Sequence, residues 1–210
     1  MSSSSQALNF TTMANTFDII RKREAELSRP IETPEKSARW YMDLIRELGL
    51  STIQTQRVFR SNIGEFVSNI IIGEMYIFTY DPKTKDKLPY YDTVPLVIPF
   101  NKVAGGFHGL NFHYLPPMLR MRLLTQLLKL TDKKNISETT RLRLSWSLLN
   151  NAARFPGVHA CVKKYLYSQM ESRIMKIYPK DWKKTVMLPI DNFKKETKQR
   201  VYNDSRNKMQ

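Results

Sequence analysis

Three segments rich in aromatic and β-branched residues, joined by short turn-forming stretches, constrain the fold of this chain more than any other feature. They span residues 75–80, 90–100 and 107–114, and an Asp-Pro pair and a Gly-Gly pair lie between them. Such residues favour strands, whereas Asp-Pro and Gly-Gly favour tight turns. The prolines of LPYYDTVPLVIPF are expected at edges or bends, because proline cannot donate to a neighbouring strand. The simplest arrangement is an antiparallel meander, curled or closed into a small barrel.

Helical patterns flank this sheet on both sides. Thr33 can cap a helix that starts at Pro34, and Gly49 favours its end. From about residue 116 onward, apolar residues recur every three or four positions, and the longest of these stretches places its basic residues on the outer face. The helices predicted there are 119–128, one that Ser137 can cap, the basic amphipathic helix 158–177, and a last helix from Asp191.

These patterns describe an α+β protein with three parts. Residues 1–30 are rich in Ser, Thr and Asn and then charged, which predicts a flexible N-terminal arm. Residues 31–190 are predicted to form a single domain, with a small antiparallel sheet or barrel at about 66–115 packed against a bundle of basic amphipathic helices at 116–190. Residues 191–210 have few apolar positions and are predicted to form an exposed C-terminal helix.

The positive charge of the chain is concentrated in its C-terminal half. The formal net charge of the 210 residues is +15. From Met1 to Met118 there are 13 Lys and Arg against 12 acidic residues, whereas from Leu119 to Gln210 there are 21 against 7. A field of this sign attracts polyanions, and nucleic acid is the abundant one. The alternative is a basic surface that docks on an acidic protein.

Basic and aromatic residues alternate in the stretch RFPGVHACVKKYLYSQMESRIMKIYPKDWKKT. Lysine and arginine contact phosphates, and aromatic rings stack on bases, so this mixture is typical of nucleic-acid binding. Several of the aromatics are expected in the core because of their helical spacing. The residues predicted to contact nucleic acid or an acidic partner are Lys163, Lys164, Arg173, Lys176, Lys183, Lys184, Lys194 and Lys195.

Reactive groups that would indicate an enzyme are not clustered in this sequence. No catalytic, cofactor-binding or metal-binding residue is predicted, and no cofactor or small-molecule substrate is implied. A metal-dependent DNA nuclease would need converging carboxylates, and Asp81, Asp86 and Asp92 are the candidates for this alternative. Turns favour aspartate for backbone and solvation reasons alone, so the structural interpretation is preferred.

The composition also limits the cellular compartments in which the protein is expected. Cys161 is the single cysteine, which excludes an internal disulfide and fits a reducing environment. No apolar run approaches the ~20 residues of a membrane span, and no secretory signal is recognisable at the N-terminus. No membrane association is therefore predicted.

The string LPYYD and the residues near 113 are interpreted as a structural motif. Tyr90, Tyr91 and Asp92 are expected to fix a bend by hydrogen bonding and packing, with His113 and Tyr114 on the neighbouring strand. The alternative is that this string is a contact surface.

Several spaced motifs resemble those of virion structural proteins from T-even-type contractile-tailed phages and their marine relatives. They are LPYYD, GLN-x-HYLPP and LPI-x-x-F, within a similarity that covers about residues 40–206. The proteins concerned are labelled DNA end protectors or minor head, neck or tail components. The resemblance implies a phage structural protein without catalytic activity, located in the virion and, during assembly, in the host cytoplasm.

Three functional hypotheses follow from charge and resemblance together. The first is a non-enzymatic virion component that binds DNA ends or packaged double-stranded DNA electrostatically, without sequence preference, and joins other virion proteins at the head, neck or tail. The second is a protein–protein adaptor of the tail or baseplate without DNA binding. The third is the metal-dependent nuclease.

Overall fold

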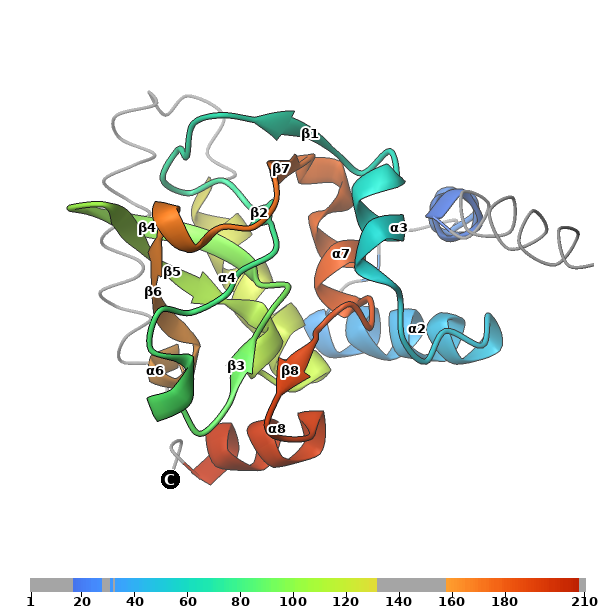
Figure 1. Ribbon diagram of the computed structural model, residues 1–210. Helices are drawn as coiled ribbons and strands as arrows, with labels where there is room; N and C mark the ends of the chain where they lie inside the picture. Colours follow the sequence, from blue (N-terminus) through green and yellow to red (C-terminus); the bar gives the residue numbers. More distant parts are fainter. Residues whose placement is uncertain (1–16, 28–30, 32, 132–157, 208–210) are drawn as a thin grey trace, which may run out of the picture.

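A computed structural model describes residues 17–27, 31, 33–131 and 158–207 of the chain. Within these residues the fold is mixed α/β and is organised around a six-stranded antiparallel sheet of order β1-β7-β2-β4-β5-β6 (Figure 1). A separate two-stranded antiparallel sheet pairs β3 with β8. The strands are β1 (Gly64–Val67), β2 (Tyr76–Ile77), β3 (Tyr91–Asp92), β4 (Leu96–Val103), β5 (Gly106–Asn111), β6 (Val162–Leu166), β7 (Ile174–Ile177) and β8 (Phe193–Lys194).

Helices cover one face of the six-stranded sheet. α2, α4 and α7 pack against one another, and their apolar side chains join one core cluster with residues of the sheet. A further helical segment at residues 17–25 adds the buried side chains of Phe17 and Ile20 to this cluster. The helices are α2 (Pro34–Glu47), α3 (Thr55–Arg60), α4 (Pro117–Thr131), α6 (Val158–Cys161), α7 (Trp182–Met187) and α8 (Lys198–Asn207), with 3₁₀ turns η1 (Lys85–Lys87), η2 (Phe112–Tyr114), η3 (Tyr167–Gln169) and η4 (Pro179–Asp181).

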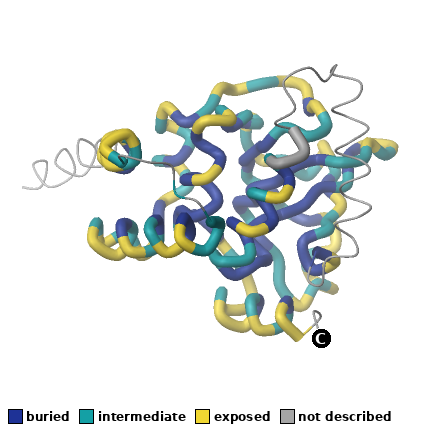
Figure 2. The backbone as a smooth tube through the Cα atoms, turned by 180° about the vertical axis from the view of Figure 1, so that it is seen from behind, coloured by how far each residue is buried: buried dark blue, intermediate teal, exposed yellow. Residues whose placement is uncertain are grey.

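The two faces of the sheet bury two different sets of side chains. Successive residues of a strand point to opposite faces, so Ile77 and Leu96 join the core under the helices while Tyr76 and Val97 join a second cluster. That second cluster is largely aromatic and includes Phe107 from β5. Figure 2 shows the buried stretches concentrated along the central strands, with exposed positions on the outer turns of the helices.

The hairpin between β4 and β5 shows how proline and glycine shape this sheet. The register of the pair shifts between Pro99 and Asn101, so the proline lies at an irregularity of the ladder, as expected. Gly105 has a φ of 71° in the turn, a conformation that residues with a Cβ rarely adopt. At Gly106, a Cβ would lie 1.9 Å from the backbone oxygen of Tyr165, so only glycine lets β5 and β6 approach this closely.

The predicted meander and the first helix are confirmed. β2, β4 and β5 are antiparallel neighbours in that order, although the segment 90–100 divides into β3 and β4. The Thr33 side chain accepts a hydrogen bond from the backbone N–H of Lys36 at 3.2 Å, and Pro34 is the first residue of α2. Gly49, with a φ of 66°, lies just beyond the end of this helix.

The predicted helix over residues 158–177 is wrong. Only Val158–Cys161 is helical, and the chain then forms β6 and β7. β6 pairs with β5, and β7 is inserted between β1 and β2, so long-range strand pairing outweighs the helical spacing of the apolar residues. The C-terminal bundle of basic amphipathic helices is therefore not confirmed, and the helix predicted after Ser137 lies outside the described residues.

The C-terminal segment differs from the helix expected from Asp191. Phe193 belongs to β8, and the helix begins only at Lys198. Val201 and Ser205 of α8 are buried, and the Ser205 hydroxyl donates to the backbone oxygen of Tyr114 at 2.7 Å. α8 is therefore anchored to the domain along one side. The division of the chain into an arm, a domain and a terminal helix stays a prediction. None of the described helices combines the length and apolarity that crossing a bilayer requires.

Candidate nucleic-acid interface

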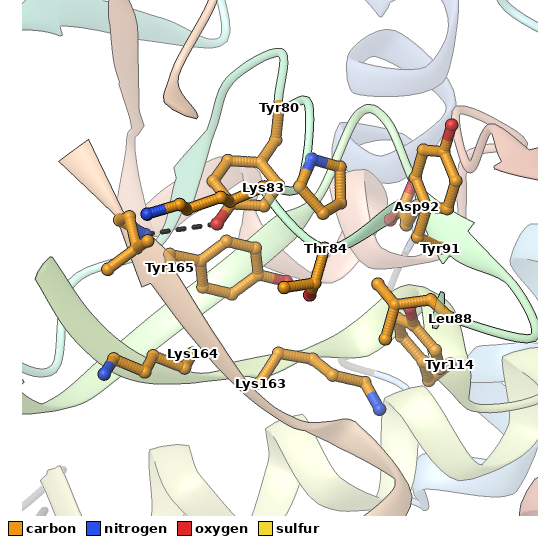
Figure 3. A pocket seen from close by; sticks show the side chains of 12 residues that line it. Tyr80, Lys83, Thr84, Leu88, Tyr91, Asp92, Tyr114, Lys163, Lys164 and Tyr165 are labelled. Atoms are coloured by element: carbon orange, nitrogen blue, oxygen red, sulfur yellow. Dashed lines mark hydrogen bonds between the residues drawn. The ribbon is translucent and has the colours of Figure 1, made fainter. Parts of the chain in front are cut away.

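A pocket of about 390 Å³ lies beside the edge strand β6 (Figure 3). Three parts of the chain that are distant in sequence form its walls: the continuous segment 80–92, which follows β2 and contains β3, the turn η2 with Tyr114, and β6. The lining residues are Tyr80, Pro82, Lys83, Thr84, Leu88, Tyr91, Asp92, Tyr114, Lys163, Lys164, Tyr165 and Leu166.

Tyrosines form the inner wall of the pocket, and the aromatic cluster behind the sheet holds them in place. The rings of Tyr80 and Tyr165 meet edge to face with centroids 5.0 Å apart, and both contact Phe78 in the same way. The Tyr80 hydroxyl accepts a hydrogen bond from the backbone N–H of Leu166 at 3.2 Å, which ties the segment after β2 to β6. The Tyr165 hydroxyl accepts from the side-chain amide of Asn111 at 3.1 Å.

These phenols are neutral at physiological pH, as tyrosines normally are, and burial makes their ionisation harder still. Burial raises the pKa of Tyr165 and Tyr114 strongly, because the low-dielectric surroundings disfavour the phenolate, and it raises the pKa of Tyr80 as well. The pocket wall therefore presents uncharged hydroxyl groups at physiological pH. Such groups can hydrogen-bond to an anionic ligand without repelling it.

Asp92 is the acidic residue among the described residues that line the pocket, and its carboxylate is fully engaged. Oδ1 accepts hydrogen bonds from the backbone N–H of Val94 at 3.0 Å and of Asn192 at 3.3 Å. Oδ2 accepts from the Asn111 amide at 3.0 Å and lies 2.8 Å from Nδ1 of His113. Asp92 is 3% exposed. Its carboxylate joins β3, η2 and the loop before β8, so its contacts stabilise the fold.

The five residues of the predicted structural motif lie close together, but His113 and Tyr114 are not on a neighbouring strand as expected. They belong to the 3₁₀ turn η2, because β5 ends at Asn111 and β3 pairs with β8. Asp92 and His113 form the buried pair just described, and the ring of Tyr90 lies 6.0 Å from that of Tyr114. Both rings also contact Phe193 of β8. Tyr91 pairs with Lys194 across the small sheet and lines the pocket. The string LPYYD thus supplies both buried contacts and part of a pocket wall.

Lysines surround the mouth of this pocket. The Lys163 ammonium lies 4.1 Å from the centroid of the Tyr114 ring, a cation–π contact that positions the charge at the wall. Figure 3 shows the side chains of Lys83 and Lys164 extending to the other side of the view from that of Lys163, and Lys83 and Lys164 are both exposed. The combination of cations with neutral aromatic hydroxyls is suited to phosphate contact and base stacking.

The other predicted contact residues are found in different environments. Lys183 and Lys194 are exposed on α7 and β8. The Arg173 guanidinium lies over the ring of Phe66, 4.3 Å from its centroid. The Lys176 ammonium forms an ion pair with Glu65 at 3.0 Å. These side chains lie away from the pocket wall.

Lys184 and Lys195 are occupied by contacts within the protein. The Lys184 ammonium is buried between the carboxylates of Asp181, at 2.7 Å, and Glu24, at 3.0 Å. The Lys195 ammonium donates to three backbone oxygens of the turn around η1, at 2.7 to 3.1 Å. Both residues stabilise the fold in this structure, so we do not include them in the candidate interface.

The carboxylates proposed for a metal-dependent nuclease do not converge. Asp81 pairs with Lys85 at 2.7 Å, and both oxygens of Asp92 accept hydrogen bonds as described. Within the described ranges, no three His, Cys, Asp or Glu side chains are grouped so that they could hold a metal ion. Burial raises the pKa of the Cys161 thiol to about 12, so this residue remains protonated.

Sequence reasoning missed the pocket residues that follow β2. Tyr80, Lys83 and Thr84 belong to a turn whose polar residues were explained by turn chemistry alone. The density of lysines in DPKTKDK was the available signal, but nothing in the sequence indicated that β6 lies opposite this turn.

The comparisons with known proteins place the chain in a class of phage proteins. Residues 6–208 match the family described as phage T4 terminal DNA protecting protein, and the chain belongs to this family. The resemblance to T-even-type phage proteins is thereby confirmed. No curated protein and no solved structure matches the chain.

Proposed function

We propose that this protein binds the ends of double-stranded DNA as a non-enzymatic component of the phage virion and shields those ends. The family match over residues 6–208 carries the proposal, because the family is described by the protection of terminal DNA. The lysine-rimmed pocket supports it, since it offers cations and aromatic groups in one place. The virion, and the host cytoplasm during assembly, are the proposed locations.

The proposed mechanism is electrostatic. Lysines that neutralise DNA phosphates release condensed counterions, which gives an affinity that is independent of sequence and sensitive to salt. Lys83, Lys163 and Lys164 provide this charge at the pocket, and the exposed Lys183 and Lys194, which do not line it, add positive charge elsewhere on the surface. A bound protein covers the terminus and thereby blocks access to it.

Other virion proteins are the second proposed class of partner. Two large apolar side chains near β1 are solvent-exposed, Phe66 at 38% and Ile71 at 44%. Exposed apolar groups of this size can take part in subunit contacts. An adaptor of the tail or baseplate would use such contacts without affinity for DNA.

Binding of the purified full-length chain to linear and covalently closed circular duplexes of the same sequence tests this function. We expect binding to both forms to weaken steeply with salt. At equal mass, linear DNA should compete for the protein more strongly than circular DNA, because only linear DNA has ends. An exonuclease challenge of the linear complex should then show delayed degradation. The slope of affinity against salt concentration counts the phosphates contacted.

Absence of binding to either DNA at low salt would overturn the proposal in favour of the adaptor. Cleavage of DNA by the purified chain in the presence of Mg²⁺ would instead support the nuclease, and Asp81→Asn, Asp86→Asn and Asp92→Asn would then identify the carboxylate involved.

A further inference from the structure

We propose that the pocket beside β6 receives the terminal nucleotide of a DNA end, so that the protein distinguishes an end from the interior of a duplex. This inference rests on the proposed function and adds to it the chemical group that is recognised. Contact with phosphodiesters alone cannot make this distinction, because the phosphodiesters of an interior segment carry the same charge as those near an end.

The size of the pocket is the first argument. A volume of about 390 Å³ falls within the range of sites that hold small ligands, roughly 300–1,000 Å³. A double helix, whose major groove alone is about 12 Å wide, cannot enter such a space. One nucleotide that has left the base stack can enter it. Leaving the stack is easiest for an unpaired or frayed nucleotide, and frayed nucleotides are found at ends.

The chemistry of the wall is the second argument. Tyr80 and Tyr165 are neutral phenols, and each hydroxyl oxygen already accepts one bond from the protein. Each phenol therefore retains its proton to donate to a base or phosphate. The rest of the wall is largely apolar and aromatic, and contacts of this kind do not depend on the hydrogen-bonding pattern of a particular base. This matches a protein that must protect ends of differing sequence.

The placement of the cations is the third argument. Lys163 is half-buried and its ammonium lies over the Tyr114 ring, whereas Lys83 and Lys164 are exposed (Figure 3). We therefore assign Lys163 to the phosphate of the nucleotide inside the pocket and the two exposed lysines to the strand that leads into it. Asp92 does not oppose this assignment, since four donors already surround its carboxylate.

The test compares the affinity of the full-length chain for an open duplex with that for a dumbbell, the same duplex closed by hairpin loops at both ends. The pocket variant is Lys163→Gln, and the matched control is Lys183→Gln, which removes the same charge from an exposed site on α7. Loss of one charge-assisted phosphate contact should reduce the affinity of Lys163→Gln for the open duplex about tenfold, with little change for the dumbbell. Lys183→Gln should change both affinities by the same small factor.

A second variant fills the pocket without removing charge. Thr84 is an exposed turn residue that lines the pocket, so Thr84→Phe occupies space with little effect on folding, which thermal unfolding would check. With the fluorescent base 2-aminopurine at the terminal position, we expect binding of the wild type to change the fluorescence, and Thr84→Phe to abolish that change. The same base placed in the duplex interior should give no change.

Two results would overturn the inference while leaving the proposed function intact. One is equal affinity of the wild type for open duplex and dumbbell. The other is a terminal fluorescence change that survives Thr84→Phe in a folded protein. A failure of the wild type to bind any DNA at low salt would instead overturn the proposed function itself.

Discussion

Two buried aspartates, Asp181 and Asp92, are stabilised by different kinds of partner. Asp181 is bound by two cations: the Arg21 guanidinium reaches it at 3.0 Å and the Lys184 ammonium at 2.7 Å. Asp92 is bound by two backbone N–H groups, the Asn111 amide and the His113 ring, although three lysines line the adjacent pocket. The carboxylate near α7 thus forms ion pairs with basic side chains. The carboxylate at the pocket is satisfied by hydrogen bonds that do not involve the pocket lysines.

The difference separates structural lysines from candidate binding lysines better than charge does. Lys184 and Lys163 both belong to Lys-Lys pairs, and the sequence ranks them alike. Around Lys184 two cations face the carboxylates of Asp181 and Glu24, so that region is close to neutral. At the pocket, the Lys163 ammonium lies over the ring of Tyr114, a cation–π contact that keeps the charge at the pocket wall.

The largest effect is expected from Lys184→Met. Removing one member of a buried ion pair leaves the carboxylates of Asp181 and Glu24 without this partner, which should lower the free energy of unfolding by about 3 kcal/mol or more. DNA affinity per folded molecule should stay unchanged. Denaturant unfolding measures the first quantity, and Lys183→Met on the same helix provides the control. A Lys184→Met protein as stable as the wild type would show that the buried pair contributes little.

Asp92→Asn should have the next largest effect. Its new NH₂ group would face the donors of Asn111 and His113, leaving buried groups unsatisfied at a cost of about 2 kcal/mol. Because the same groups shape the pocket, we expect the preference for DNA ends to fall as well. Unfolding and binding should be measured on the same preparation. Loss of stability with an unchanged end preference would separate this cluster from the pocket.

The pH dependence of stability reports on the cations around Asp181. Burial by itself would raise the pKa of Asp181, but hydrogen bonds from Arg21 and Lys184 outweigh it and place the pKa below the ordinary 3.8. A carboxyl whose pKa is lower in the folded state stabilises the fold above its unfolded pKa, and this contribution is lost as the pH falls through the folded pKa.

We therefore expect the unfolding free energy of the wild type to fall below about pH 4, by about 1.4 kcal/mol for each unit by which the pKa is lowered. In Lys184→Met the decline should begin at the same pH, end at a higher pH and be smaller, since one of the two cations that lower the folded-state pKa is missing. Denaturant titrations between about pH 2 and 5 test this. Identical profiles for both proteins would show that Lys184 does not set the pKa of Asp181.

The smallest effect on stability is expected from Lys164→Ala. This exposed residue lies at the pocket rim, so the free energy of unfolding should stay within about 0.5 kcal/mol of the wild-type value. The salt dependence of DNA binding should become shallower by about one phosphate contact. An unchanged salt slope would remove Lys164 from the interface.

Local patterns were sufficient to predict the meander and α2. The strands β2, β4 and β5 follow one another closely, and each is rich in residues that fit a pleated surface. The start of α2 depends on Thr33 and Pro34 alone, which act within one helical turn. Elements of this kind form for reasons that lie within a few residues of each other.

The error at residues 158–177 has a nonlocal cause. β6 is short, and its consecutive lysines at 163 and 164 break the alternation typical of a strand, so the helical spacing of neighbouring apolar residues dominated the pattern. β6 is a strand because β5 offers it a partner, with Gly106 permitting the close approach. The pocket could not be predicted for the same reason, since the turn at Lys83 and the lysines of β6 are about 80 residues apart in sequence.

The pocket wall is formed by segments that are distant in sequence, and this affects the stability of the protein when a ligand is bound. A ligand that touches both the turn after β2 and strand β6 binds the folded state and not the unfolded chain, so it adds to stability in proportion to the logarithm of its concentration over its dissociation constant. Occupancy would then raise the unfolding midpoint of the whole domain. If the occupant is a DNA end, the protection is mutual. The protein protects the terminus from degradation, and the bound terminus stabilises the protein against unfolding.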